Sequence, residues 1–170
     1  MLQVETPTLS TAILLTLFSA ALLCPPTVVG AEPAAGTGPS SFGPNRLPPH
    51  LRKVSITMGH KVITGVVADT LTSRIEGLLK WTGMDDDTGM LLDFGADRAY
   101  SIHMQGMKFP IDAVWMDAEL KVRVIYESIQ PNSGITYSSM FPSRYCLELN
   151  AGFCRRFGVR VDQQIRVGHR

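Results

Sequence analysis

The chain has 170 residues, and its shares of hydrophobic residues, 45%, and of charged residues, 18%, are those of an ordinary globular protein. Its formal net charge of +1 excludes a strong electrostatic attraction to nucleic acid or to anionic membranes. This length is sufficient for one compact domain with terminal appendages.

Residues 1–31 are typical of a secretory signal peptide. An apolar run over Thr11–Cys24 is shorter than the roughly 20 residues that span a bilayer, and two prolines end it. Residues 29–31, Val-Gly-Ala, offer the small side chains that a signal peptidase requires. We therefore expect cleavage near Ala31 and an extracytoplasmic protein, periplasmic or secreted, with no transmembrane span. Because residues 1–10 contain no Lys or Arg, a misassigned start and a retained weak anchor stay open as alternatives.

Residues 32–52 have a composition dominated by Pro, Gly, Ala and Ser. Such a segment cannot bury enough apolar surface to order itself, so we predict a disordered linker over 32–52. The remaining residues, 53–170, are numerous enough for a single hydrophobic core, and we predict one domain there.

The first half of the domain alternates between strand and helix signals. Gly59 lies between two runs rich in β-branched residues, which is typical of a hairpin. Thr70 offers an N-cap to the segment that follows, whose expected apolar stripe is Ile75, Leu78 and Leu79. The expected elements, in chain order, are strands over 54–57 and 61–67, a helix over 71–80, and strands over 90–94 and 98–104.

In the second half of the domain, the sequence predicts a strand buried on both faces, followed by three further strands and one helix. Residues 111–116 are apolar at every position but one, as in a strand buried on both faces. Residues 120–127 alternate between apolar and polar, as in a half-exposed antiparallel strand. A strand over 145–149, a helix over 151–157 that Gly158 ends, and a strand over 164–167 follow. These elements predict a mainly β fold (β-rich α+β), a small antiparallel barrel or sandwich with two short helices.

Several short motifs occur in an order and at spacings that resemble a known family. They are R-x-x-G-L from Arg74, G-M-L from Gly89, F-P-I-D from Phe109 and L-E-L-N-A-G from Leu147. Together they cover about residues 62–167, and they resemble the family catalogued as domain of unknown function 192. The resemblance implies a small extracytoplasmic β-rich domain with no agreed reaction.

Two carboxylic acids, Asp112 and Glu148, lie within apolar strands and therefore need hydrogen-bond donors or a cation. In a structural interpretation, Arg74 pairs with one of them and backbone N–H groups satisfy the other. We expect Glu148 to accept from the start of the last helix or to pair with Arg74. In a catalytic interpretation, the two carboxyl groups form an acid–base pair in a cleft.

Two further sets of residues are candidates for a site. His103 and Met107 offer an imidazole and a thioether that suit Cu(I), although strand alternation places His103 and Met104 on opposite faces. Cys146 and Cys154 remain after signal cleavage and could form a disulfide in an oxidising compartment, or they are two buried small hydrophobes.

The function that we expect is a non-catalytic, extracytoplasmic binding or accessory module rather than an enzyme. Two alternatives stay open: a small hydrolase or lyase that uses Asp112 and Glu148, and a periplasmic copper-binding protein. We predict no cofactor, a small molecule or a protein as partner, no nucleic acid, and a monomer. Convergence of Arg74, His103, Asp112 and Glu148 on one pocket would favour the enzyme.

Overall fold

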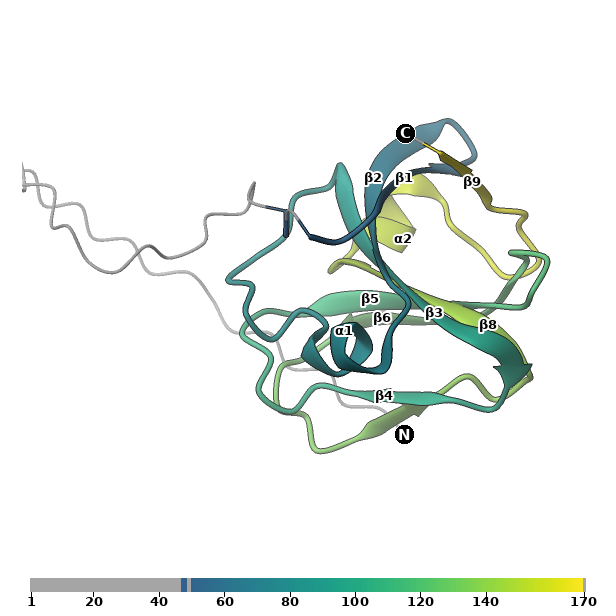
Figure 1. Cartoon of the computed structure of the whole chain (residues 1–170). Helices are drawn as coiled ribbons and strands as arrows, with labels where there is room; N and C mark the ends of the chain where they lie inside the picture. The colour runs from purple at the N-terminus through teal and green to yellow at the C-terminus, as the bar shows by residue number, and fades with distance from the viewer. Residues whose placement is uncertain (1–46, 49, 170) are drawn as a thin grey trace, which may run out of the picture. The chain divides into compact units, whose positions relative to one another are not determined.

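The structure, a computed structural model, describes residues 47, 48 and 50–169 (Figure 1). The expected signal peptide, residues 1–31, lies outside the described residues, as do residues 32–46 of the expected linker. The end of that linker belongs to the domain, because Leu47 and Leu51 pack against its core. The carbonyl of Arg52 also accepts a hydrogen bond from the N–H of Val67 at 2.9 Å.

The described residues form nine strands and two short helices, so the prediction of a mainly β fold is confirmed. The strands are β1 (Lys53–Met58), β2 (Lys61–Ala68), β3 (Thr88–Arg98), β4 (Ser101–His103), β5 (Ile111–Met116), β6 (Val122–Ile129), β7 (Thr136–Ser138), β8 (Ser143–Asn150) and β9 (Arg166–His169). The helices are α1 (Leu71–Glu76) and α2 (Phe153–Phe157). The sequence did not predict β7, a three-residue strand that forms by pairing with β4.

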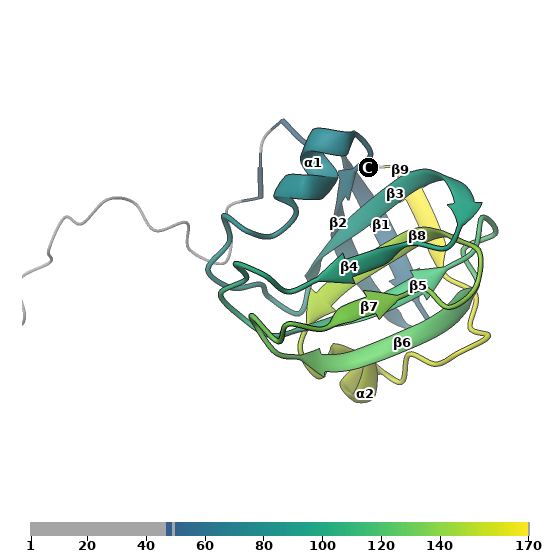
Figure 2. The ribbon, with the colours of Figure 1, turned by 90° about the horizontal axis from the view of Figure 1, so that it is seen from below.

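Seven strands form one sheet in the order β6-β5-β8-β3-β2-β1-β9, and β4 pairs with β7 in a separate ribbon. The sheet is mixed, whereas we expected only antiparallel pairs, because β2 and β3 run parallel with Val66 opposite Met90. A parallel pair needs a long crossover connection, and residues 69–87, which include α1, supply it. Figure 2, seen from below, shows the ribbon β4–β7 in front of β8 and β5.

The large sheet curls until its two ends approach each other, but it does not close into a barrel. The contact is one isolated bridge between Lys121 and Gln164, beside which the N–H of Ile165 donates to the carbonyl of Leu120 at 3.0 Å. The architecture is therefore an open, strongly curled sheet covered by the ribbon, closer to a sandwich than to a barrel.

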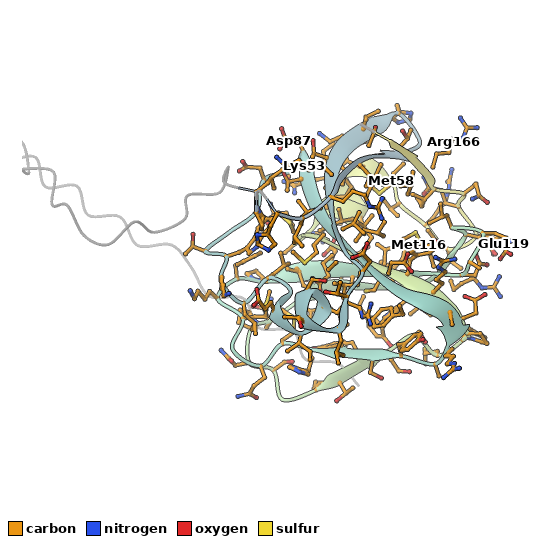
Figure 3. All side chains as sticks on the ribbon, in the orientation of Figure 1. Lys53, Met58, Asp87, Met116, Glu119 and Arg166 are labelled. Carbon is orange, nitrogen blue, oxygen red and sulfur yellow. The ribbon has the colours of Figure 1, made fainter. Side chains whose placement is uncertain are left out.

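Two hydrophobic cores lie on opposite faces of the sheet. The ribbon-side core lies between the sheet and the ribbon β4–β7, and it includes Leu78 and Trp115. The helix-side core lies inside the curl together with α2, and it includes Met58, Met116 and Phe153. Figure 3 shows Met58 of β1 and Met116 of β5 inside the molecule, whereas the labelled charged side chains lie at its surface.

Helix α1 is shorter than the sequence predicts and buries no residue of its own. The Thr70 hydroxyl caps it by accepting a hydrogen bond from the N–H of Ser73 at 3.1 Å. Gly77, with φ 41°, ends it. Of the predicted apolar stripe only Leu78, beyond the helix end, is buried, while Ile75 is 66% exposed. Helical spacing therefore predicted the helix and its start at Leu71, but neither its length nor a buried face.

Candidate functional site

Asp112 is fully buried on β5, and backbone N–H groups hold its carboxylate. Its Oδ1 accepts hydrogen bonds from the N–H groups of Ser128 at 2.7 Å and Gly152 at 2.9 Å, and its Oδ2 accepts one from Cys154 at 2.8 Å. These bonds tie the start of α2 and the end of β6 to β5. Because hydrogen bonds replace lost hydration, they compensate the burial of this carboxylate. The geometry gives Asp112 a structural role.

Glu148 on β8 is also buried, but it lacks the partners that we expected for it. Its Oε2 has no hydrogen-bond partner among the described residues. The expected bonds from the start of the last helix belong to Asp112 instead. Burial raises the pKa of Glu148 from 4.5 to about 7, because an apolar surrounding disfavours the charged form.

The strand register places these two carboxyl groups on opposite faces of the sheet. Asp112 pairs with Leu149, which belongs to the helix-side core. Glu148 pairs with Ala113 and with Met90, which both belong to the ribbon-side core. Directly paired residues project from the same face. The structure therefore does not bring together the two carboxyl groups of the predicted hydrolase or lyase.

Arg74 contacts main-chain carbonyls rather than a carboxylate. Its Nη1 donates to the carbonyls of Asp69 at 2.7 Å and Asp93 at 2.6 Å. Its guanidinium lies over the ring of Phe94, 5.5 Å from the ring centroid. Arg74 therefore fastens α1 to β3 and fixes the backbone at Asp93.

The two copper candidates lie in different surroundings. His103 on β4 is exposed, and its Nδ1 accepts a hydrogen bond from the N–H of Gln105 at 3.3 Å. Met107, like Met104, is buried in the ribbon-side core. Strand alternation separated His103 from Met104 as expected: the imidazole is exposed, whereas the thioethers of Met104 and Met107 are buried. Among the described residues, no group of three or more His, Cys, Asp or Glu side chains could hold a metal ion.

Cys146 and Cys154 are both free and buried, so the disulfide that the sequence allowed is not formed. Cys146 lies in the ribbon-side core and Cys154 in the helix-side core, with the sheet between them. Burial raises the pKa of both thiols, and the charges of Glu148 and Asp112 respectively add to the effect. Neither thiol is therefore an activated nucleophile.

A small pocket of about 100 Å³ lies at the mouth of the helix-side core, where β9 curls over the sheet. Its rim carries Arg52, Asp93 and Tyr145. Four apolar residues line the pocket: Val67 of β2, Leu91 of β3, Val167 of β9, and Leu120 in the turn that precedes β6. None of the four site residues predicted from the sequence lines this pocket, although Arg74 positions the backbone of Asp93.

Leu120 adopts a left-handed backbone conformation, with φ 63°, at the edge of this pocket. For a residue with a side chain this conformation costs roughly 1–2 kcal/mol. Leu120 lies in the turn between β5 and β6, where its N–H donates to the carbonyl of Asp117 at 3.1 Å, and its side chain lines the pocket.

The charges at the rim are fixed by hydrogen bonds. Asp93 accepts from Arg144 Nε at 3.0 Å and Nη2 at 3.2 Å, and from the N–H of Gly95 at 2.8 Å. Burial acts to raise the pKa of Asp93, but these bonds outweigh it and hold the pKa below its usual value. Burial, with the charge of Asp93, raises the pKa of Tyr145. At neutral pH the rim therefore carries a carboxylate and a protonated phenol.

The sequence contained one signal for this pocket. Asp93 interrupts the apolar run Met90–Phe94, and a charged residue inside a buried strand requires a partner. Its partner Arg144 and its neighbours Arg52 and Tyr145 are distant in sequence, and only the pairing of β3 with β8 brings Asp93 and Tyr145 together.

Fold and site together define a small mainly β domain whose open, curled mixed sheet carries a surface pocket. A family model matches residues 53–167, and the chain belongs to that family, domain of unknown function 192 (DUF192), described as "Uncharacterized ACR". The resemblance inferred from the motifs is thereby confirmed.

Two solved structures are similar to this chain. One, from Sinorhizobium meliloti 1021 and named as a candidate transcription regulator, is 29% identical with a TM-score of 0.64, over 68% of this chain and 92% of the other. The second, a protein of unknown function from Novosphingobium aromaticivorans, is 20% identical with a TM-score of 0.64, over 81% of this chain and 99% of the other. Because the second structure is only 20% identical, its similarity is evidence for the fold and not for a function. No curated protein matches the chain.

No helix within the described part of the chain is long and apolar enough to cross a membrane.

Proposed function

We propose that this domain is a non-catalytic binding module that acts outside the cytoplasm and holds a small ligand in the pocket at Arg52, Asp93 and Tyr145. The observation that carries the proposal is the pocket itself, with an apolar lining and a rim of polar groups. Such a combination is what small-molecule sites use to bind and orient a ligand.

The protonation states at the rim favour binding over proton transfer. A general acid or base works best when its pKa lies near the operating pH. The pKa of Asp93 lies below its usual value and that of Tyr145 above it, so both move away from neutrality. Neither group is therefore suited to exchange a proton with a ligand at neutral pH.

The rim also indicates the chemistry of the ligand. Arg52 pairs with Asp69 at 3.6 Å, but both side chains are about half exposed, and such a pair is weak. The guanidinium is thus able to turn toward a ligand carboxylate. Arg144 already balances the charge of Asp93, but Asp93 Oδ2 accepts only one hydrogen bond from the described residues and can accept another from a ligand ammonium N–H. A short aliphatic body fits the apolar lining. The ligand class that meets all three conditions is a small aliphatic amino acid in its zwitterionic form.

The S. meliloti structure's name suggests DNA as an alternative partner. A DNA-binding surface needs clustered positive charge to neutralise phosphates. The formal net charge of this chain is only +1, which favours the small ligand.

L-valine, isovaleric acid and isobutylamine test this ligand class, because the second lacks the ammonium group and the third lacks the carboxylate. Calorimetric titration of the full chain is expected to give tightest binding for valine, with each fragment about tenfold weaker, the equivalent of about 1.4 kcal/mol for one lost charge contact. Replacing Arg52 by Gln should weaken valine but not isobutylamine. Lys53→Gln, at the exposed neighbouring residue, is the control and should change neither. Equal binding of all three compounds, or none, would contradict the proposal.

Export is tested separately. Expressed in a bacterium with its own N-terminal segment, the protein is expected outside the cytoplasm, with a new N-terminus near Glu32, because the apolar run and the small residues before Glu32 match a signal peptide. Cell fractionation and N-terminal sequencing measure both. Full-length protein confined to the cytosol would disprove export.

A further inference from the structure

Two buried polar atoms in the ribbon-side core have no hydrogen-bond partner among the described residues: Trp115 Nε1 and Glu148 Oε2. Trp115 is fully buried, and Glu148 is 8% exposed. The indole N–H can only donate a hydrogen bond, whereas a carboxyl oxygen can accept one. Buried polar groups of this kind nearly always have a partner, so each of the two requires an explanation.

The strand register places these two groups beside each other. Trp115 pairs with Cys146, and Ala113 pairs with Glu148, across the same two strands, β5 and β8. Trp115 and Glu148 are therefore diagonal neighbours on one face, within reach of long side chains. Cys146 lies next to both. Its thiol is close enough to Glu148 that the carboxylate charge, after burial, contributes to the raised pKa of Cys146.

Among the residues that the structure describes, no charged group forms an ion pair with Glu148. On β3 it faces Met90, on β5 it faces Ala113 and Trp115, and on its own strand its titratable neighbour is Cys146. The segments that cover this core contribute apolar side chains, among them Leu78, Trp81, Met84 and Met104. Burial alone accounts for the raised pKa of Glu148. The partner that this cluster lacks is thus neutral and hydrogen-bonding.

We propose that Trp115, Cys146 and Glu148 form an internal site for one small neutral ligand that both donates and accepts hydrogen bonds, with water as its simplest occupant. A water molecule there accepts from the indole N–H and from the weakly donating thiol, and it donates to Glu148 Oε2. One molecule thereby satisfies both unpartnered groups. Because Glu148 binds a proton near neutrality, the polarity of this site changes in a pH range that extracytoplasmic proteins encounter.

Indole NMR signals test the site directly. The chain contains two tryptophans, Trp81 and Trp115, so the full chain labelled with ¹⁵N gives two indole signals, which Trp115→Phe assigns. We expect the Trp115 indole proton to show a nuclear Overhauser effect to a long-lived bound water, and its chemical shift to follow a step near pH 7. Trp81, which covers the same core, is the comparison in the same sample: its indole should lack the water contact and show a smaller step.

Two variants distinguish the site from simple packing. Glu148→Gln keeps a hydrogen-bonding side chain, so the water signal should remain while the pH step disappears. Glu148→Leu removes the acceptor, so the water signal should be lost. A Trp115 indole proton that shows no contact with water in the unmodified chain, or that donates directly to Glu148, would overturn the proposal. Retention of the water signal in Glu148→Leu would also overturn it.

Discussion

Replacing Asp112 by Ala is expected to lower the free energy of unfolding by at least about 3 kcal/mol, the largest loss that we predict for a single side chain. The change leaves the N–H groups of Ser128, Gly152 and Cys154 without their acceptor. Each buried donor left unsatisfied costs about 1–3 kcal/mol. For a domain of this size the melting temperature should fall by more than about 10 °C.

Asp112→Asn refines this test. The amide keeps one oxygen but places an NH₂ group where a carboxylate oxygen faced an N–H, so the expected loss is smaller, about 1–3 kcal/mol. Glu119→Gln removes the same charge from an exposed turn and should leave stability unchanged. Urea unfolding of the full-length variants measures all three. A stability that is unchanged or raised in Asp112→Ala would contradict the structural role, because functional carboxylates are often held at a cost in stability.

Glu148→Gln is expected to stabilise the protein above pH 7. The hydrogen bonds that the sequence led us to expect for Glu148 would have made the same change destabilising. The folded pKa of Glu148 is about 7 against 4.5 ordinarily, so between these values the folded protein holds a proton that the unfolded chain releases. Stability from this group is therefore fully present below pH 4.5 and is lost as the pH rises to 7. The loss amounts to about 3 kcal/mol.

Gln remains neutral at every pH and should not show this loss. The difference in unfolding free energy between Glu148→Gln and the unmodified chain should grow in favour of the variant by about 2–3 kcal/mol between pH 5 and pH 8. Comparing the two proteins at each pH cancels the opposite contribution of Asp93, whose pKa is lowered. A constant difference across this range would show that Glu148 titrates normally in the folded protein.

Local patterns in the sequence predicted most of the elements because the forces that form them act locally. Residues 111–116 are apolar on both faces, and β5 is buried along its whole length between β6 and β8. The turn at Gly59, with φ 61°, joins β1 and β2 as expected. Helix α2 ends at Gly158 in the left-handed conformation that the sequence indicated.

The site was less predictable because it depends on pairing between distant strands. The sequence showed that Asp112 and Glu148 need partners, but it could not show which carboxylate reaches the start of α2. The β5–β8 register decides this, since it turns Asp112 toward α2 and Glu148 away from it. Likewise, no short stretch of sequence indicates the parallel pairing of β2 with β3. The same holds for the ion pair between Asp93 and Arg144, which are 51 residues apart.

The most direct test of a binding role is a map of where valine contacts the protein. In a titration of the full chain with methyl groups labelled by ¹³C, we expect chemical-shift changes at the methyl groups of Val67, Leu91, Leu120 and Val167, which line the pocket. Methyl groups beside Glu148, those of Met90 and Ala113, should not change. Changes confined to Met90 and Ala113, or an unchanged spectrum, would contradict the assignment of a ligand-binding function to this pocket.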